Sequence, residues 1–471
     1  MLKEILLFTA LSLCVFSYSQ VTLVRDIKSF GAKGDGRTND HAAFERAAAF
    51  FNSRKGNGTL IIPRGIYIVG KQIITNGKEG RLNWEGQDVL HFSNVRNLTI
   101  KGMPGTVVRY TGGMKFGSFD PGSGKPRQGN SYFVDARYGA SIGLCISIDQ
   151  SQNVTIAGLE LDGNQGAIVM GGIYGDVGRQ LPHYGIFIQN SNNITVQEVN
   201  AHHFGLDGIS VANVKSNTPD RIRLLGCKFN FNARQGLSWI GGNGLIAKNC
   251  QFNHSGKGKF SSAPAAGLDI EAEYGPISGG MFEACEFIDA TGCCMVADVG
   301  NSRDIVFDNC TFWSSTAWSI WATRPGFTFT RCKIYGPIVH GYDAPNDKDA
   351  TKFIQCTIED RAYNGQQPAG QFLIETNNCR RVRFESCTIT ANYKKLLWLE
   401  TPITWKPEEK YKFINCTLTA NSSKFNQGDY IAVLRGAYYK NTVFKFSKKY
   451  YLNTCCGSYN IDAGGNKTVT F

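Results

Sequence analysis

FDNCTF, residues 307–312, is one copy of a short phrase that decides the fold of this chain. In the phrase, an apolar residue stands three positions before a cysteine and another stands two positions after it. Repeats that recur every 22 to 35 residues, as these do, are typical of a solenoid whose turns carry loops of different lengths. Eight copies fill the second half of the chain, centred on Cys227, Cys250, Cys285, Cys310, Cys332, Cys356, Cys387 and Cys416.

Upstream, ordinary hydrophobic residues occupy the cysteine position of the phrase. We assign Leu159 in NVTIAGLEL, Val199 in NITVQEVNA and Met103 in NLTIKGM to that position. A disulfide needs a specific partner, whereas a core column needs only a small apolar side chain at each level. Structural zinc needs paired ligands a few residues apart, and the closest cysteine pairs here are adjacent. The cysteines are therefore predicted to form a stacked, reduced ladder in the core.

The N-terminal part of the chain predicts a cap for this solenoid. VRDIKSFGAKGDGRTND, residues 24–40, contains a short strand, a glycine-rich turn and a helix cap at Asn39 or Asp40. The following segment, residues 41–53, has the periodicity of an amphipathic helix. Such a helix would cover the open edge of the first turn, which otherwise invites aggregation. The apolar face of the helix is predicted to consist of Ala43, Phe44, Ala47, Ala48 and Phe51.

The same region resembles a known superfamily. FGAKGDGRTNDHAAFERA (residues 30–47), followed by GTLIIPRGIYIV (residues 58–69), is similar to the opening segment of the pectate-lyase-like superfamily. The resemblance implies an all-β fold, a right-handed single-stranded parallel β-helix, here of about ten turns, with an N-terminal capping helix. Chemistry does not follow from it, because the superfamily includes polygalacturonase-like hydrolases, polysaccharide lyases and alginate epimerases.

The catalytic signatures of these groups are absent from the sequence. There is no Asp-Asp pair after glycine, no Gly-His-Gly and no Asp-Pro-His-Glu, and residues 221–223, Arg-Ile-Arg, only echo the Arg-Ile-Lys element of polygalacturonases. Candidate catalytic residues must therefore come from the pattern of this chain itself.

Composition and targeting indicate an exported, ordered protein. Residues 1–20 read as a signal peptide, so we expect secretion or periplasmic export of one β-helix domain over residues 21–471, in which residues 21–70 form the opening segment and cap. No later segment is apolar for the roughly 20 residues of a membrane span. The net charge of +12 is scattered, which disfavours nucleic acid and favours an anionic polysaccharide as partner. We expect a monomer.

Four successive strands, each preceded by glycine, carry the candidate site. They are YGIFIQN (184–190), DGISVAN (207–213), QGLSWIGG (235–242) and AGLDIEAEYG (266–275). Aligning the glycines and applying strand alternation predicts which positions face solvent. The first outward column is Phe187, Ser210, Ser238 and Asp269, and the second is Gln189, Ala212, Ile240 and Glu271.

Three carboxylates are expected to project from one strand. Asp269, Glu271 and Glu273 alternate along it, with about 6.6 Å between successive outward backbone positions, and Asp298 on the next turn approaches Glu273. Like charges at this spacing raise at least one pKa, so one carboxyl can act as an acid while its neighbour acts as a base or nucleophile. We predict Asp269 and Glu271 as catalytic residues, together with Asp207 at a neighbouring corner.

Other groups converge on the same place. An arginine beside the acids could clamp a carboxylate or sulfate ester bidentately, and aromatic rings could stack on sugars. Two glycine-containing insertions, residues 163–182 and 254–265, could wall a cleft with mobile rims. The predicted substrate-binding residues are Arg234, Gln235, Glu273, Asp298, Tyr184 and Trp321, with Phe187 and Trp313 as further surface aromatics and Trp239 and Trp318 pointing inward.

Alternatives remain open for each group. The acids could be a solvated face paired with Arg234 or Arg303, Asp207 could simply shape its turn, and His202 and His203 fit surface residues better than bases. A glycoside hydrolase without a cofactor explains the acids best. The runner-up is a calcium-dependent polysaccharide lyase, with Arg234 or Lys257 as base, and the third class is a non-catalytic glycan-binding protein. In the lyase, the calcium ligands would be Asp269, Glu271, Glu273 and Asp298.

Overall fold

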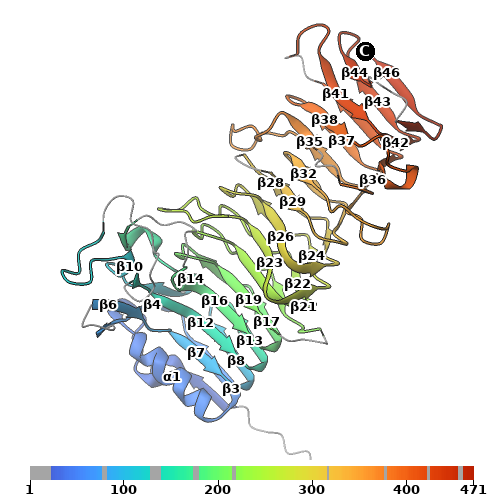
Figure 1. The fold of residues 1–471 in the computed structure, drawn as a ribbon. Coiled ribbons are helices and arrows are strands. Elements are labelled where there is room, and N and C mark those ends of the chain that lie inside the picture. Colours follow the sequence, from blue (N-terminus) through green and yellow to red (C-terminus); the bar gives the residue numbers. More distant parts are fainter. Residues whose placement is uncertain are drawn as a thin grey trace, which may run out of the picture.

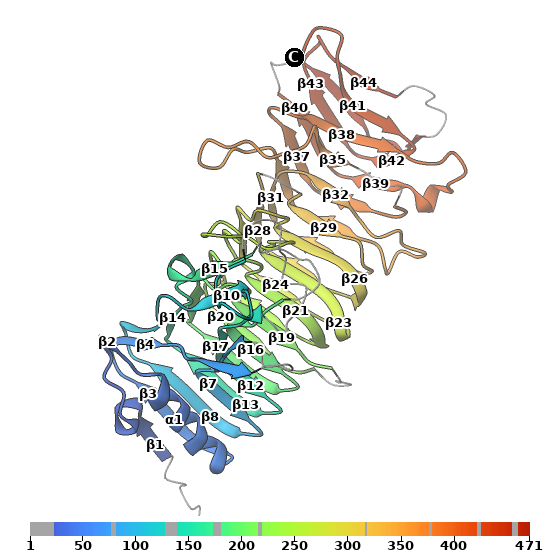
Figure 2. The same cartoon turned by 60° about the vertical axis from the view of Figure 1, so that its left-hand side comes forward.

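The computed structural model describes residues 23–76, 82–127, 139–172, 180–214, 219–315, 318–375, 379–421, 425–454 and 460–471. The predicted signal peptide lies outside these ranges. The chain winds as a parallel β-helix in which strands of successive turns pair side by side along the whole molecule (Figure 1, Figure 2). Within the described ranges, none of the helices has the length and apolar character needed to cross a membrane.

Three faces run along the solenoid. The first face is a 15-stranded parallel sheet in the order β1 (Leu23–Asp26), β3 (Gly56–Ile62), β8 (Arg96–Gly102), β13 (Gln152–Ala157), β17 (Asn192–Gln197), β20 (Arg223–Leu225), β22 (Ile246–Lys248), β24 (Met281–Glu283), β27 (Val306–Asp308), β30 (Thr328–Thr330), β33 (Lys352–Ile354), β36 (Arg383–Glu385), β39 (Tyr411–Ile414), β42 (Ala437–Lys440) and β45 (Ile461–Asp462). The second face is a 13-stranded sheet in the order β7 (Leu90–Ser93), β12 (Gly143–Asp149), β16 (His183–Gln189), β19 (Ile209–Ala212), β21 (Leu237–Asn243), β23 (Leu268–Ser278), β26 (Met295–Arg303), β29 (Ile320–Ala322), β32 (Ile338–His340), β35 (Phe372–Glu375), β38 (Lys395–Glu400), β41 (Tyr430–Arg435) and β44 (Tyr451–Asn453).

The third face is formed by two sheets in line, joined by single parallel bridges from Asn200 through Lys228 and Gln251 to Glu286. The first of them contains β2 (Asp35–Asn39), β4 (Gly65–Val69), β9 (Thr106–Tyr110), β14 (Glu160–Asp162) and β18 (Asn200–His202). The second contains β25 (Glu286–Ile288), β28 (Thr311–Trp313), β31 (Lys333–Tyr335), β34 (Thr357–Glu359), β37 (Thr388–Ala391), β40 (Thr417–Ala420), β43 (Val443–Phe446) and β46 (Lys467–Thr470). A separate mixed sheet beside the first turns consists of β5 (Gln72–Asn76), β6 (Leu82–Gly86), β11 (Gly139–Ala140), β10 (Lys115–Ser118) and β15 (Val169–Gly171).

The repeated phrase forms the corner between the first and third faces. Phe307 lies in β27, Cys310 at the corner and Phe312 in β28, and all three side chains are fully buried. The described cysteines are all free, which confirms the reduced ladder. Each ladder thiol donates to a carbonyl of the preceding turn, as Cys310 Sγ does to the oxygen of Phe282 at 3.3 Å. Beside the ladder, phenylalanine rings stack in a column with centroids 4.9–5.0 Å apart.

Two details of the repeat prediction are wrong. Met103 is not a core residue, because 41% of it is exposed. In its turn Thr106 is buried instead, and its hydroxyl donates to the carbonyl of Ile62 at 2.9 Å. The solenoid is also longer than ten turns, with 15 strands on its first face. Turns near both ends escaped detection because their corners use other residues, such as Thr442, whose hydroxyl donates to the carbonyl of Phe413.

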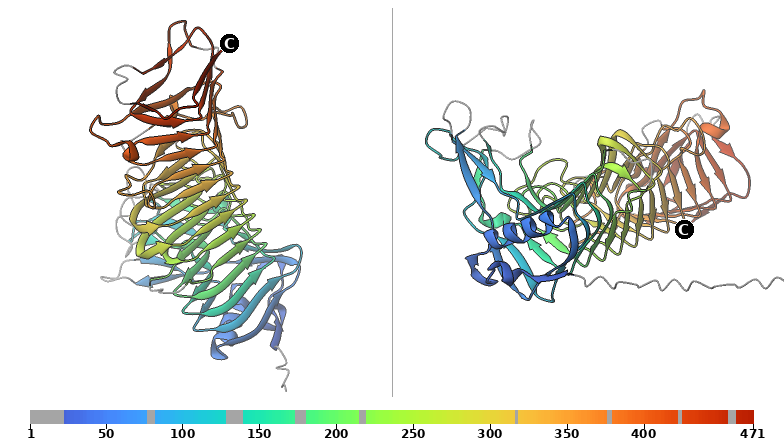
Figure 3. Two further views of the ribbon diagram at one scale, coloured as in Figure 1. Left: turned by 90° about the vertical axis from the view of Figure 1, so that its right-hand side faces the viewer. Right: turned by 90° about the horizontal axis from the view of Figure 1, so that it is seen from below.

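The predicted capping helix is confirmed as α1 (His41–Ser53), which lies across the end of the first turns (Figure 3). Its buried face contains the five predicted apolar residues together with His41. Asp40 is the first residue before the helix, but its carboxylate accepts from the backbone of Lys33 and Gly34 in the preceding turn. Asn39 instead accepts from the backbone nitrogen of His41 at 3.0 Å. Both predicted cap positions therefore help to hold the turn in place.

Candidate active site

The predicted column of outward residues exists on the second face. Phe187, Ser210, Ser238 and Asp269 pair in register from β16 through β19 and β21 to β23. Flanking inward positions, Leu268 and Ile270 among them, are fully buried in the core. The register continues from Asp269 through Val296 of β26 to Trp321 of β29. The second predicted column breaks, because a shift in register pairs Ala212 with Gly241 rather than with Ile240.

Phe187 is partly exposed, but the expectation that the other three residues of this column face solvent is wrong. Ser238 and Asp269 have no exposed surface, and Ser210 has 1%. Both insertions contact this corner: the amide of Ser262 donates to the carbonyl of Ala233 at 2.9 Å, and Gln180 binds Arg234. Described residues of both insertions therefore lie beside the corner that carries Ala233 and Arg234.

Four polar atoms in this buried region lack a hydrogen-bond partner among the described residues. They are the hydroxyls of Ser210 and Ser238, Oε1 of Gln235 and Oδ1 of Asp269. Leaving a buried polar atom unpaired costs about 1–3 kcal/mol. The other ends of the amide and the carboxyl are engaged, since Nε2 of Gln235 donates to Oδ2 of Asp269. Buried polar atoms of this kind commonly pair with ordered water or a bound ion, or serve a catalytic role.

Asp207 and Arg234 form a buried ion pair beside this cluster. Nε of Arg234 donates to Oδ1 of Asp207 at 2.8 Å, and Nη2 donates to Oδ2 at 2.6 Å. The side chain of Arg234 is 9% exposed and that of Asp207 is not exposed at all. Burial raises the pKa of Asp207, and the charge of Arg234 opposes that rise. The structure thus places both residues in a bidentate pair with each other, whereas the sequence suggested an arginine fork open to substrate.

Asp269 combines burial with neighbouring negative charge. Burial is the largest cause that raises its pKa well above the usual range, followed by the carboxylate of Glu271, with Asp298 also contributing. Arg234 acts in the opposite direction. Such an environment favours the protonated form of the carboxyl group. Since Oδ2 already accepts from Gln235, the unpartnered Oδ1 is the atom from which a proton can be donated.

The other acids are arranged by depth. Glu271 is half-buried and Glu273 is exposed, so exposure increases along β23 away from Asp269. One residue lies between Asp269 and Glu271, whereas two lie between their partners Val296 and Val299, which shows a bulge in β26 next to the site. Asp298 lies within that bulge and is half-buried.

Of the predicted aromatic residues, some lie near the acids and some do not. Tyr184 is half-buried, packs edge-on against Phe187 with centroids 5.5 Å apart, and interacts electrostatically with Arg234. Trp321 is half-buried beside Trp318, with ring centroids 4.3 Å apart. Trp318 is therefore only partly inward, while Trp239 is fully buried as predicted. Trp313 is wrong as a surface aromatic, because it is 2% exposed.

Possible metal ligands gather elsewhere. Among the described residues, Asp162, His202 and His203 form the one group of three whose ligand atoms all lie within 4.8 Å of one another. The four acids suggested for calcium do not form such a group. Lys257, suggested as a lyase base, has its Nζ 3.4 Å from Oδ1 of Asp289.

Asp162 was not predicted as a functional residue, although the alignment of neighbouring turns places it beside His202. Aligning Leu159 with Val199 also aligns Asp162 with His202, and the structure pairs these two residues.

Comparisons with known proteins agree with the architecture. A family model described as a right-handed β-helix region matches residues 144–334 and 278–471. No curated protein matches the sequence. Among solved structures, the A-module of mannuronan C-5 epimerase AlgE6 from Azotobacter vinelandii is 14% identical over 94% of this chain and 97% of that chain, with a TM-score of 0.52. The N-terminal fragment of gene product 12 from bacteriophage phi29 is 13% identical over 95% of this chain and 71% of that one, with a TM-score of 0.54. At such identities the likeness shows the fold alone.

Proposed function

Because the chain belongs to the family of right-handed β-helix proteins, we propose that it is an exported polysaccharide-degrading enzyme, a glycoside hydrolase whose acid is Asp269. The resemblance to the pectate-lyase-like superfamily holds for the fold, and the proposal for the chemistry rests on the site. One observation carries it: Asp269 is a buried carboxyl with a raised pKa and one unpartnered oxygen, next to the more exposed carboxylate of Glu271.

Two carboxyl groups in different environments can divide the work of glycoside hydrolysis. The protonated Oδ1 of Asp269 donates to the glycosidic oxygen as the bond to the leaving sugar breaks. Glu271, the less buried acid, is the ionised partner that attacks the anomeric carbon or activates water. Asp269 is buried and has a raised pKa, whereas Glu271 is more exposed, and this difference supports the assignment of roles.

The unpartnered polar atoms supply contacts for the sugar. Hydroxyls of Ser210 and Ser238 can donate or accept, and Oε1 of Gln235 accepts, so each could pair with a sugar hydroxyl. Arg234 and Asp207 hold each other rigidly at the corner that carries Gln235, which gives them a positioning role. Asp269 has no exposed surface, so the proposal requires a local opening at the site before a polymer can bind.

We infer an acidic glycan, uronic or sulfated, as the substrate class. The support is the net charge of +12, which raises the local concentration of polyanions around the protein.

The experiment is a product analysis on a panel of neutral, uronic and sulfated glycans. A hydrolase yields saturated products with new reducing ends, and its rate is unchanged after treatment with a chelator. Unsaturated products that absorb in the ultraviolet, formed only with calcium, would replace the hydrolase by a lyase acting at the same site. Binding without any product would overturn the proposal in favour of a glycan-binding protein.

A further inference from the structure

We propose that Asp162, His202 and His203 form a binding site for a divalent transition metal, with Zn²⁺ as the best-fitting ion. The site is separate from the acids of β23, and its test does not depend on the proposed hydrolase activity. It lies at the start of the first insertion, where β14 and β18 end.

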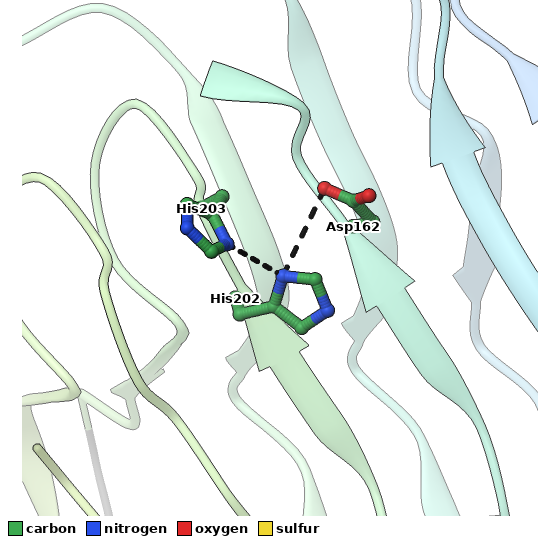
Figure 4. A group of neighbouring side chains, drawn as sticks. All are labelled: Asp162, His202 and His203. Atoms are coloured by element: carbon green, nitrogen blue, oxygen red, sulfur yellow. Dashed lines mark hydrogen bonds and ion pairs between the residues drawn. The ribbon is translucent and has the colours of Figure 1, made fainter. Parts of the chain in front are cut away.

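Backbone geometry brings the three ligands together. Asp162 and His202 are paired neighbours on β14 and β18. Adjacent residues on a strand point to opposite faces, but His203 follows the end of β18 and has a left-handed φ of 57°. Its ring consequently approaches that of His202, with 2.8 Å between the two Nδ1 atoms, and 3.8 Å separates Nδ1 of His202 from Oδ1 of Asp162 (Figure 4).

A second carboxylate sets the tautomer of His202. Oε1 of Glu160 lies 3.4 Å from Nε2 of His202, on the opposite side of the ring from Asp162 and His203. A carboxylate at the far nitrogen retains a proton there and leaves the lone pair on Nδ1, as in many metal-binding histidines. The two facing Nδ1 atoms share at most one proton in the neutral pair, and a metal ion can take its place.

Asp162 is also held from outside the site. Nε of Arg109 donates to Oδ2 of Asp162 at 2.7 Å, and the backbone nitrogen of Asn164 donates to Oδ1 at 2.8 Å. Ligating carboxylates are commonly oriented by such bonds. Arg109 offsets one negative charge, while Glu160 adds one, so the surroundings of the two imidazoles keep a net negative charge.

The donor set selects the kind of metal. Two imidazole nitrogens and one carboxylate oxygen suit zinc and its neighbours, whereas calcium and magnesium favour sets of oxygen ligands. Tetrahedral zinc with bonds of 2.0–2.1 Å to nitrogen places ligand atoms about 3.3 Å apart. The observed separations of 2.8 and 3.8 Å lie on either side of that value. Three protein ligands leave a fourth position for water.

A metal ion at this site would stabilise the contact between the two insertions through a chain of hydrogen bonds. The backbone nitrogen of Gln165 donates to the carbonyl of His203 at 3.0 Å, and Oε1 of Gln165 accepts from the backbone nitrogen of Lys259 in the second insertion at 2.6 Å. Fixing His203 therefore fixes a chain of bonds that runs from the first insertion into the second. Metal that binds only the folded protein also raises its melting temperature.

The test is calorimetric titration of chelator-treated full-length protein with Zn²⁺ alone, in a buffer that does not bind metals. We expect one Zn²⁺ per chain and a higher melting temperature with the metal. His202→Ala should abolish the saturable binding, and Glu160→Gln, which keeps all three ligands, should weaken it about 10–100-fold. His91→Ala is the matched control, because His91 is a half-exposed histidine paired with Asp88 away from the cluster and should leave binding unchanged.

Other sources of zinc binding are separated by two further measurements. Cys293 is the described cysteine that is not fully buried, so binding has to persist in Cys293→Ser. A large excess of Ca²⁺ should not displace the zinc. No saturable binding by the unmodified protein, or equal binding by the His202→Ala and His91→Ala variants, would overturn the proposal, as would displacement by Ca²⁺. None of these outcomes depends on hydrolase activity.

Discussion

Replacing Arg234 with methionine should destabilise the protein strongly. The substitution leaves the carboxylate of Asp207 buried, with 0% of its side chain exposed, and removes both charged donors that hold it at 2.8 and 2.6 Å. Breaking a buried pair by removing one partner costs about 3–5 kcal/mol, because the remaining charge is uncompensated. The contact of Arg234 with Gln180 is lost as well, which places the expectation at the upper end of that range.

The assay is urea unfolding at neutral pH, followed by circular dichroism. Arg303→Met is the matched control, since Arg303 pairs with Asp304 and Asp349 while 39% of its side chain is exposed, and exposed pairs contribute about 0–1 kcal/mol. The double variant Asp207→Leu/Arg234→Met should recover part of the loss, because no buried charge is then left alone. A loss below about 1 kcal/mol in Arg234→Met, equal to that of Arg303→Met, would refute the description of this pair.

Three further predictions concern the ladder, the acid and the charge. Cys310→Ala should cost at most a few kcal/mol in unfolding free energy and leave activity intact, and inactivity in a folded variant would contradict a purely structural ladder. The pKa of Asp269 is raised in the folded protein, so its protonated carboxyl stabilises the fold at low pH, and this contribution is lost as the pH rises through the folded-state pKa. The free energy of unfolding of the unmodified protein should therefore fall with rising pH more than that of Asp269→Asn. Parallel pH profiles for the two proteins would disprove the buried acid. Binding to an acidic glycan should weaken as salt rises, because exposed charges are screened beyond about 8 Å at physiological ionic strength. Equal affinity for neutral and acidic glycans at low salt would contradict the prediction of an anionic substrate.

Much of the fold was predictable from sequence because the solenoid repeats its own packing rules. Cys310 and its counterparts occupy the same corner in successive turns, so the short repeated phrase predicts a column of buried residues that runs through the molecule. Strand alternation likewise placed Ser210, Ser238 and Asp269 in one register. Both predictions depend only on how neighbouring turns stack, and the repeat and the strand alternation determine that stacking.

Burial of the site could not be predicted in the same way. Alternation shows that Asp269 points outward from the sheet, but not that its side chain is fully buried there. The pairing of Asp207 with Arg234 depends on a corner whose geometry the strand pattern does not specify. His203 joins His202 only because of a left-handed backbone angle, which is uncommon for a non-glycine residue and which the strand pattern does not predict.

The central claim is that Asp269 supplies the proton in glycoside hydrolysis, and the most direct test is the rate of reducing-end formation by Asp269→Asn. The substitution keeps the shape of the side chain and removes the transferable proton, so the rate on the best glycan of the panel should fall by about 100- to 10,000-fold. Glu283→Gln is the matched control: Glu283 pairs with Lys248 at 2.6 Å on the first face, and its loss should leave the rate unchanged. Full activity in folded Asp269→Asn would contradict the claim.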